Sequence, residues 1–177
     1  MADAVPALRL FFALWPDEAA RAAMVRAQRL LGHPPGARPV APENLHLTMA
    51  FLGMQPATLL PEITAILDRV TVPELTLEVD RYGSFSRARI AWAGIVRPPP
   101  ALAALHEELM DALRECGIGH DKASAFRPHI SLLRNAVCEG GSVDEPFSWH
   151  APPLALVQST TMPSGPVYTV LAQRAAR

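Results

Sequence analysis

Two tetrapeptides with the same chemical pattern stand far apart in the chain, His46-Leu47-Thr48-Met49 and His129-Ile130-Ser131-Leu132. In each, a histidine is followed by an apolar residue, a hydroxyl residue and a second apolar residue. Successive side chains of a β-strand point to opposite faces, so the imidazole and the hydroxyl would lie on one face and the apolar residues on the other. We expect each tetrapeptide to bury its apolar residues in a core and to present its polar pair to a common cleft.

Two such pairs suit the opening of a cyclic phosphodiester. Water must attack phosphorus from one side while the ring oxygen leaves on the other, so a base and an acid must flank the substrate. Histidine serves in both roles because its pKa lies near neutrality. The hydroxyls of Thr48 and Ser131 are suited to donate hydrogen bonds to the phosphate oxygens that gain charge during attack. This chemistry requires neither a metal ion nor a cofactor, and we expect neither.

The remaining histidines and cysteines show no metal-site pattern. Four histidines are scattered through the chain, namely His33, His106, His120 and His150. None of them forms a ligand pair such as His-Glu-x-x-His. The two cysteines, Cys116 and Cys138, have no metal-type spacing and supply no disulfide framework, so we assign them no chemistry.

The elements that must hold the two tetrapeptides alternate between strand and helix patterns. Apolar or alternating segments predict strands at residues 8–14, 45–52, 75–79, 89–96, 130–133, 154–159 and 167–172. Helices are predicted from Asp17 to about residue 31, from about 57 to 70, and from 100 to 116, where Gly117 is typical of a C-cap. The proline-rich segment 32–42 is predicted to be a loop. Antiparallel hairpins are expected, including one at the end of the sequence, and they favour the α+β class over a wound parallel sheet.

Length and composition indicate one compact domain. The 177 residues are half apolar, which is enough for one sizeable core. The chain has 16 Lys and Arg against 17 Asp and Glu, a net charge of −1, whereas proteins that bind long stretches of nucleic acid usually carry a basic excess. Any RNA that it binds would therefore be held by a local contact. Asp3 stands where a secretory signal would carry positive charge, and the apolar stretch 10–15 is too short to cross a membrane. We therefore expect a soluble cytoplasmic protein that acts without a membrane and as a monomer.

Several segments look like the signatures of one protein family. They are RLFFAL at residues 9–14, PENLHLTMAFLG at 42–53, GSF at 83–85 with AW at 91–92, FRPHISLLR at 126–134, and GPVY at 165–168. Together they resemble the two-histidine (2H) phosphoesterases, and within these the RNA 2′,3′-cyclic phosphodiesterases, also described as 2′-5′ RNA ligases. The resemblance extends over nearly the whole chain.

The resemblance implies that residues 1–177 form a single bilobal α+β domain, with two pseudo-symmetric lobes of antiparallel sheet and helix around a central cleft. It implies hydrolysis of a 2′,3′-cyclic phosphate to a 2′-phosphate, at an RNA end or on a small cyclic nucleotide, with His46 as proton donor and His129 as proton acceptor. Arg134 matches a family position that contacts the phosphate. Strict alternation would turn Arg134 away from His129, so we expect a strand end or a bulge to redirect it. Ser131 departs from the family's more usual threonine but retains the hydroxyl.

Other side chains are weaker candidates for the site. The cationic residues in loops near the tetrapeptides are Arg38, Lys122 and Arg127, and of these we assign Arg38 and Arg127 to substrate binding. The aromatic residues within apolar strands, Phe11, Phe51 and Trp92, are expected in the core and not in the site.

The same residues are compatible with other activities. The reverse reaction would join RNA ends through a 2′-5′ linkage, and a 2′-5′ oligonucleotide or another cyclic nucleotide could be the substrate. A non-catalytic module that binds RNA ends is the third possibility. The presence of both histidines and both hydroxyls argues against that module, while the direction of the reaction is left open by the sequence.

Overall fold

A computed structural model describes residues 6–122 and 125–177. Its strands form one nine-stranded sheet in the order β7-β4-β5-β6-β3-β1-β8-β9, with β2 paired to β6, and every described pairing is antiparallel. The strands are β1 (Ala7–Leu14), β2 (Arg38–Pro39), β3 (Leu47–Pro56), β4 (Thr76–Phe85), β5 (Ile90–Gly94), β6 (His129–Arg134), β7 (Gly141–His150), β8 (Leu154–Met162) and β9 (Gly165–Arg174). The helices are α1 (Glu18–Leu31), α2 (Leu60–Arg69) and α3 (Pro100–Glu115), with short 3₁₀ turns at Pro42–Asn44 and Ala57–Leu59.

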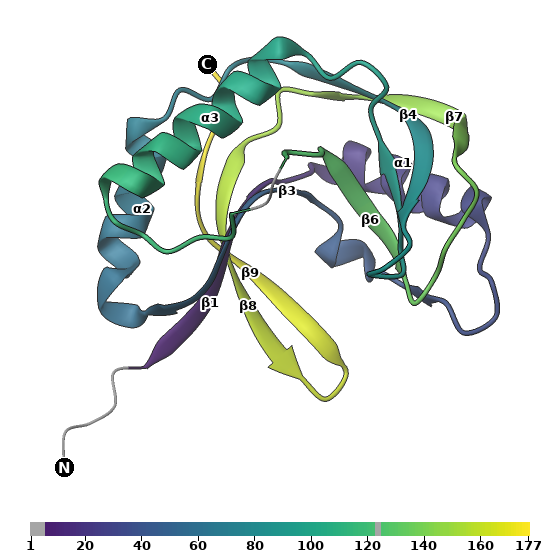
Figure 1. Ribbon diagram of the computed structural model, residues 1–177. Coiled ribbons are helices and arrows are strands. Elements are labelled where there is room, and N and C mark those ends of the chain that lie inside the picture. The colour runs from purple at the N-terminus through teal and green to yellow at the C-terminus, as the bar shows by residue number, and fades with distance from the viewer. Residues whose placement is uncertain (1–5, 123–124) are drawn as a thin grey trace.

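The sheet divides into two lobes at its centre (Figure 1). The first lobe contains β3, β1, β8 and β9, and helices α2 and α3 pack on it. The second lobe contains β6, β5, β4 and β7, and helix α1 packs against β6 and β7. The lobes meet where β3 pairs with β6 at Leu47 and Ile130. The prediction of a bilobal α+β fold is confirmed.

The chain passes between the lobes several times. Strand β1 lies in the first lobe and α1 in the second, β3 and α2 return to the first, and β4 and β5 lie in the second. Helix α3 then packs on the first lobe, β6 and β7 complete the second, and β8 and β9 complete the first. Each lobe is therefore assembled from segments that are separated in the sequence.

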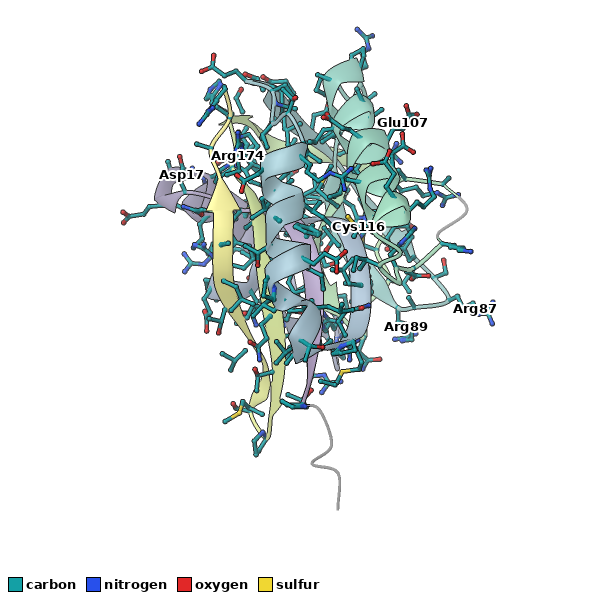
Figure 2. The ribbon with its side chains drawn as sticks, turned by 90° about the vertical axis from the view of Figure 1, so that its left-hand side faces the viewer. Asp17, Arg87, Arg89, Glu107, Cys116 and Arg174 are labelled. Atoms are coloured by element: carbon teal, nitrogen blue, oxygen red, sulfur yellow. The ribbon has the colours of Figure 1, made fainter. Side chains whose placement is uncertain are left out.

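The helix ends follow local sequence signals. Asp17 caps α1, because its carboxylate accepts a 2.8 Å hydrogen bond from the Ala20 amide, and Gly32 ends that helix with φ of +76°. Gly117 follows α3 with φ of +65°, a conformation that costs glycine little. Figure 2 shows α2 and α3 side by side on the sheet of the first lobe. These predicted helix boundaries are confirmed to within a few residues.

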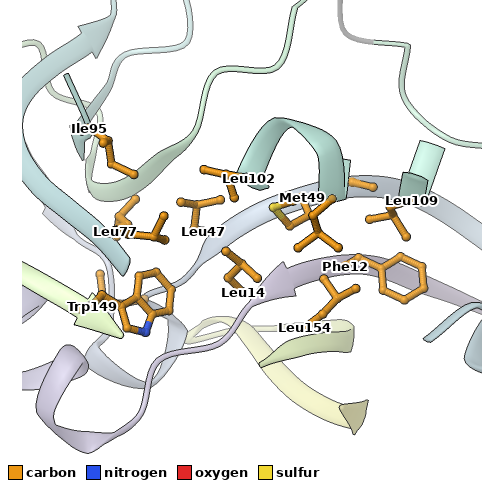
Figure 3. Close-up of a cluster of buried hydrophobic side chains, with 14 of the residues drawn as sticks. Phe12, Leu14, Leu47, Met49, Leu77, Ile95, Leu102, Leu109, Trp149 and Leu154 are labelled. Carbon is orange, nitrogen blue, oxygen red and sulfur yellow. The ribbon is translucent and has the colours of Figure 1, made fainter. Parts of the chain in front are cut away.

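One hydrophobic core connects both lobes (Figure 3). Leu14, Leu47 and Leu154 of the first lobe belong to the same buried cluster as Leu77 and Trp149 of the second. A second, smaller cluster covers the opposite face of the first lobe and is built on Phe11, Ala13, Ala155 and Val157. Because Leu47 lies in the core, the β-strand that starts with it is anchored directly beside His46.

Several strand predictions were wrong in detail, and the strand predicted at 75–79 continues to Phe85. Segment 32–42, predicted to be a loop, contains the two-residue strand β2, because Arg38 and Pro39 pair with the end of β6. Strand β7 was missed, because most of its side chains are exposed and its sequence contains Pro146. A proline is tolerated there since β7 is an edge strand. Strand β3 continues past Gly53, where a φ of +67° accommodates the chain without ending the ladder.

No helix in residues 6–122 or 125–177 is long and apolar enough to cross a membrane.

Candidate active site

The two tetrapeptides lie on adjacent antiparallel strands at the boundary between the lobes. Leu47 of the first pairs with Ile130 of the second, and both side chains are buried. The polar side chains are only partly buried: His46 directly before β3, Thr48 on β3, and His129 and Ser131 on β6. The alternation predicted from the sequence is therefore present in both copies, and it places the polar pairs together on one side of the sheet.

The His46 ring is held at both nitrogens. Its Nδ1 donates to the Asn44 carbonyl at 2.7 Å, and its Nε2 accepts from the Thr48 hydroxyl at 2.8 Å. Asn44 belongs to the 3₁₀ turn that leads into β3, and its own side-chain amide donates to the Pro166 carbonyl of β9 at 2.8 Å. The backbone contact selects the tautomer with Nδ1–H, which leaves Nε2 as the nitrogen that exchanges protons.

Aromatic rings surround His46. Trp15 stacks on it with a centroid distance of 5.7 Å and an interplanar angle of 16°. Phe11 lies at 4.9 Å, and Tyr168 of β9 approaches edge-on at 5.5 Å. These contacts limit the access of water to the imidazole, which favours its neutral form.

His129 is held in the same way in the second lobe. Its Nδ1 donates to the Arg127 carbonyl at 2.6 Å, so both histidines bond to the carbonyl two residues before them. Phe85 meets the ring edge-on at 4.7 Å, and Trp92 lies at 6.3 Å. The shared backbone contact again leaves Nε2 for proton transfer.

The electrostatics of the site favour two neutral imidazoles in the absence of an anion. The pKa of His46 is lowered to about 4, chiefly by burial and also by the neighbouring His129 and Arg134 groups, while the hydrogen bond to Asn44 acts in the opposite direction. Burial also lowers the pKa of His129, against the effect of its bond to Arg127. His129 and Arg134, on the second lobe, are thus close enough to His46 to affect its pKa across the lobe boundary.

The fourth residue of each tetrapeptide is a β-bulge. The register between β1 and β3 passes over Met49, and the register between β5 and β6 passes over Leu132. Each bulge shifts the alternation by one position, so that an exposed residue follows two places later, Phe51 on β3 and Arg134 on β6. The bulge expected near Arg134 is present, and Phe51 is its counterpart in the first lobe.

The arginines assigned to substrate binding lie on the second lobe. Arg38 pairs in register with Arg134 across β2 and β6, so their backbones are neighbours at the end of β6. Arg127 lies just before His129. Within residues 6–122 and 125–177, none of these three exposed side chains forms an ion pair. Lys122 is exposed as well.

A cavity of about 640 Å³ adjoins His129. Its lining includes Phe85, Trp92 and Phe126 together with Arg81 and Arg127, so it combines aromatic and cationic side chains. His46, Thr48 and Ser131 are not among its lining residues. The cavity thus lies on the second lobe and reaches the site at His129.

The aromatic surroundings of the site were not predicted from the sequence. Trp92 was expected in the core, but it lines the cavity beside His129. Phe51 was also expected in the core and is 50% exposed. Phe11 is buried, as expected, yet its ring contacts His46. Phe51 could have been suspected from its place two residues after the first tetrapeptide. Nothing in the sequence indicates that Tyr168 of β9 lies beside His46.

No group of three or more His, Cys, Asp or Glu side chains suited to hold a metal ion occurs in the part of the chain that the structure describes. The groups that the structure brings together at the lobe boundary are two imidazoles and two hydroxyls, with Arg134 close enough to affect His46.

Comparisons with known proteins agree with this fold. The chain is 34% identical to RNA 2′,3′-cyclic phosphodiesterase of Escherichia coli K12 over 142 residues, which cover 80% of each protein. It is 34% identical to the protein of the same name from Thermus thermophilus over 178 residues, covering 93% of this chain and 88% of that one. The crystal structure of E. coli LigT complexed with 3′-AMP superposes with a TM-score of 0.86 at 30% identity, covering 97% of this chain and 99% of the other.

The family model described as the 2′-5′ RNA ligase superfamily matches residues 15–137. This match contains both tetrapeptides and the strands that carry them. The chain therefore belongs to the 2′-5′ RNA ligase superfamily, the two-histidine phosphoesterases that its motifs resemble.

Proposed function

We propose that this protein hydrolyses 2′,3′-cyclic phosphates at RNA ends to 2′-phosphates by acid–base catalysis without a metal ion. The observation that carries the proposal is the pairing of two His–hydroxyl motifs on adjacent strands, each with its histidine Nδ1 fixed by a backbone carbonyl. Such a pair supplies an acid and a base on rigid elements. The relatives named RNA 2′,3′-cyclic phosphodiesterase support the choice of substrate.

The reaction requires one proton to be removed and one to be supplied. Nε2 of His129 accepts a proton from water as the water oxygen bonds to phosphorus. Nε2–H of His46 donates its proton to the 3′-oxygen as the bond from that oxygen to phosphorus breaks. The products are a free 3′-hydroxyl and a 2′-phosphate, and a second proton exchange with solvent restores both histidines.

Thr48 links the state of His46 to phosphate binding. In the structure its hydroxyl donates to the unprotonated Nε2. When His46 takes up a proton, Nε2–H becomes the donor and the Thr48 hydrogen is released to bond a phosphate oxygen. Ser131 supplies the corresponding hydroxyl on β6. Protonation of His46 and stabilisation of the anionic phosphate are thereby coupled.

The arginines of the second lobe define the kind of substrate. Arg134 lies close enough to lower the pKa of His46, and an anionic phosphate bound between them would offset both positive charges. We assign Arg38 and Arg127 to RNA phosphates near the cyclic end, because both are exposed cations next to β6. The complex of LigT with 3′-AMP supports a nucleotide as the minimal ligand of this site. Our proposal includes a monomer made of one bilobal domain that acts in the cytoplasm.

The test is an oligoribonucleotide that ends in a 2′,3′-cyclic phosphate, incubated with the protein in EDTA. We expect conversion to a 2′-phosphate, identified by mass and phosphatase sensitivity. His46→Ala and His129→Ala should each reduce the rate by about 10²- to 10⁴-fold, the usual contribution of general acid or base catalysis. His150→Ala is the matched control, since His150 is an exposed histidine on β7 bonded to Thr76, and it should keep full activity.

Other outcomes identify the alternatives. Binding of the cyclic-phosphate end without turnover would reject catalysis in favour of an RNA-end binding module. Joining of that end to a 5′-hydroxyl partner, in place of hydrolysis, would identify a 2′-5′ ligase. The two histidines serve either direction of this chemistry, so both substrates belong in the same assay.

A further inference from the structure

A buried glutamine on α1 contacts both segments that carry the catalytic motifs. Gln28 is 5% exposed and lies on a helix face whose other buried residues are alanines and Met24. Its Nε2 donates to the Val40 carbonyl at 2.9 Å and to the Leu132 carbonyl at 2.8 Å. An uncharged polar side chain in such a place is retained only where its hydrogen bonds are made, so these two carbonyls account for its presence.

The two carbonyls belong to the backbone segments that lead to His46 and to Arg134. Leu132 is the bulge residue of β6, between Ser131 and Arg134. Val40 precedes the 3₁₀ turn that leads to His46, and its own amide donates to the Leu132 carbonyl at 2.9 Å. The bulge interrupts the pairing of β6 with β5, so Leu132 is held from the other side of β6. There Val40 continues the β2–β6 register, and Gln28 bonds the same Leu132 carbonyl.

The chemistry of the contact calls for an amide at position 28. Both partners are acceptors, and a neutral NH₂ group offers two donors to them. A methionine would fill the same volume but would leave the buried Val40 carbonyl without the glutamine donor. An ionised glutamate would direct negative charge at two carbonyl oxygens.

We propose that Gln28 is a positioning residue that holds the Leu132 bulge so that Arg134 faces the phosphate site together with Ser131. Gln28 acts through the backbone of β6 and touches no substrate. The assignment of Arg134 to the phosphate rests on the proposed function, whereas the effect of Gln28 on the position of Arg134 does not.

A double-mutant cycle tests the proposal in the full-length protein. With a nucleoside 2′,3′-cyclic phosphate as substrate, Gln28→Met should raise KM about tenfold, within the range measured for groups that act together. In an Arg134→Gln background the same substitution should change KM less than twofold. Gln28→Asn, which keeps an amide on a shorter side chain, should show the same coupling at smaller amplitude.

A second buried glutamine provides the control. Gln55 is 6% exposed, and its Nε2 donates to the Leu52 carbonyl at 2.6 Å and the Gly119 carbonyl at 2.9 Å. Leu52 is also passed over in the β1–β3 register, so Gln55 supports a bulge that lies outside the tetrapeptides. Gln55→Met should lower stability as Gln28→Met does, but its effect on KM should be unchanged by Arg134→Gln.

A readout independent of turnover is the NMR titration of His46. Because the charge of Arg134 lowers the pKa of His46, Gln28→Met and Gln28→Asn should raise that pKa and weaken the binding of inorganic phosphate, while Gln55→Met should do neither. An inactive wild-type protein would reject the proposed function alone, since the titration still tests Gln28. Additive effects of Gln28 and Arg134 on KM, or an unchanged His46 titration in both Gln28 variants, would overturn the proposal.

Discussion

At the scale of the residue, the low pKa of His46 has a consequence for the pH dependence of the reaction. An acid with a pKa of about 4 in the free protein is mostly unprotonated near neutrality. In the proposed mechanism, the proton that His46 donates must therefore be taken up together with the anionic substrate, whose negative charge raises the pKa of a neighbouring imidazole. His129, the proposed base, has its pKa lowered from 6.5 by burial, which favours the neutral imidazole that accepts a proton.

We expect kcat/KM, which reports the free enzyme, to be highest on the acidic side of pH 6.5 and to fall as the pH rises above it, because the fraction with a protonated His46 declines. The descending limb of kcat should lie at higher pH, since bound phosphate keeps His46 protonated. Initial rates between pH 4 and 9, with NMR titration of His46 with and without inorganic phosphate, measure both effects. Identical descending limbs for kcat and kcat/KM would contradict proton uptake on binding.

The residues that could be predicted from the sequence are those whose role follows from local alternation. His46, Thr48, His129 and Ser131 were located because a period of two assigns each side chain to a face. Trp92 was placed in the core, since its apolar strand does not reveal that a cavity opens beside it. Contacts such as that between Tyr168 and His46 depend on the pairing of distant strands, which local pattern does not encode.

At the scale of the element, the ring of Trp92 lies directly against the backbone of two glycines, Gly83 on β4 and Gly94 on β5. A Cβ added to Gly83 would lie 2.3 Å from Trp92 Cζ2, and one added to Gly94 would lie 2.8 Å from Trp92 Cζ3. The indole therefore occupies the space that side chains at both glycines would need. Its ring also packs against Phe85, with a centroid distance of 5.6 Å, so these strands shape the wall of the cavity beside His129.

Gly83→Ala should consequently displace Trp92, lower the free energy of unfolding by about 1–3 kcal/mol as other overpacked sites do, and reduce kcat/KM. Denaturant unfolding and steady-state kinetics measure the two effects. The control is Gly141→Ala on neighbouring β7, because an added Cβ there meets nothing within 4 Å. A Gly83→Ala protein with wild-type kinetics would show that the position of Trp92 is irrelevant to the site.

The elements with strong internal signals were predictable, and those that depend on a neighbour were not. The sequence of helix α1 contains the signals that predict it: the N-cap Asp17, apolar residues at helical spacing and the C-cap Gly32. Strand β2 exists because β6 offers two residues a partner, and β7 exists as an edge on β4 despite a largely exposed sequence. A prediction from local strand propensity therefore missed β2 and β7, because their stability comes from pairing with neighbouring strands.

At the scale of the whole molecule, the common core predicts cooperative unfolding. The buried cluster contains residues of both lobes, and each lobe carries segments from both halves of the sequence. We expect a single transition in urea, with tryptophan fluorescence and far-UV circular dichroism giving the same midpoint. Two separated midpoints would show that the lobes unfold independently despite the shared core.

The interlaced path of the chain also bears on its synthesis. Strand β1 leaves the ribosome well before its outer neighbour β8, which follows more than a hundred residues later. Tyr168, which packs against His46, comes later still. A nascent chain that already contains both tetrapeptides thus has an unclosed first lobe and an incompletely shielded His46. Catalytic competence should arise only when the β8–β9 hairpin docks, which makes translation of that hairpin the step that activates the enzyme.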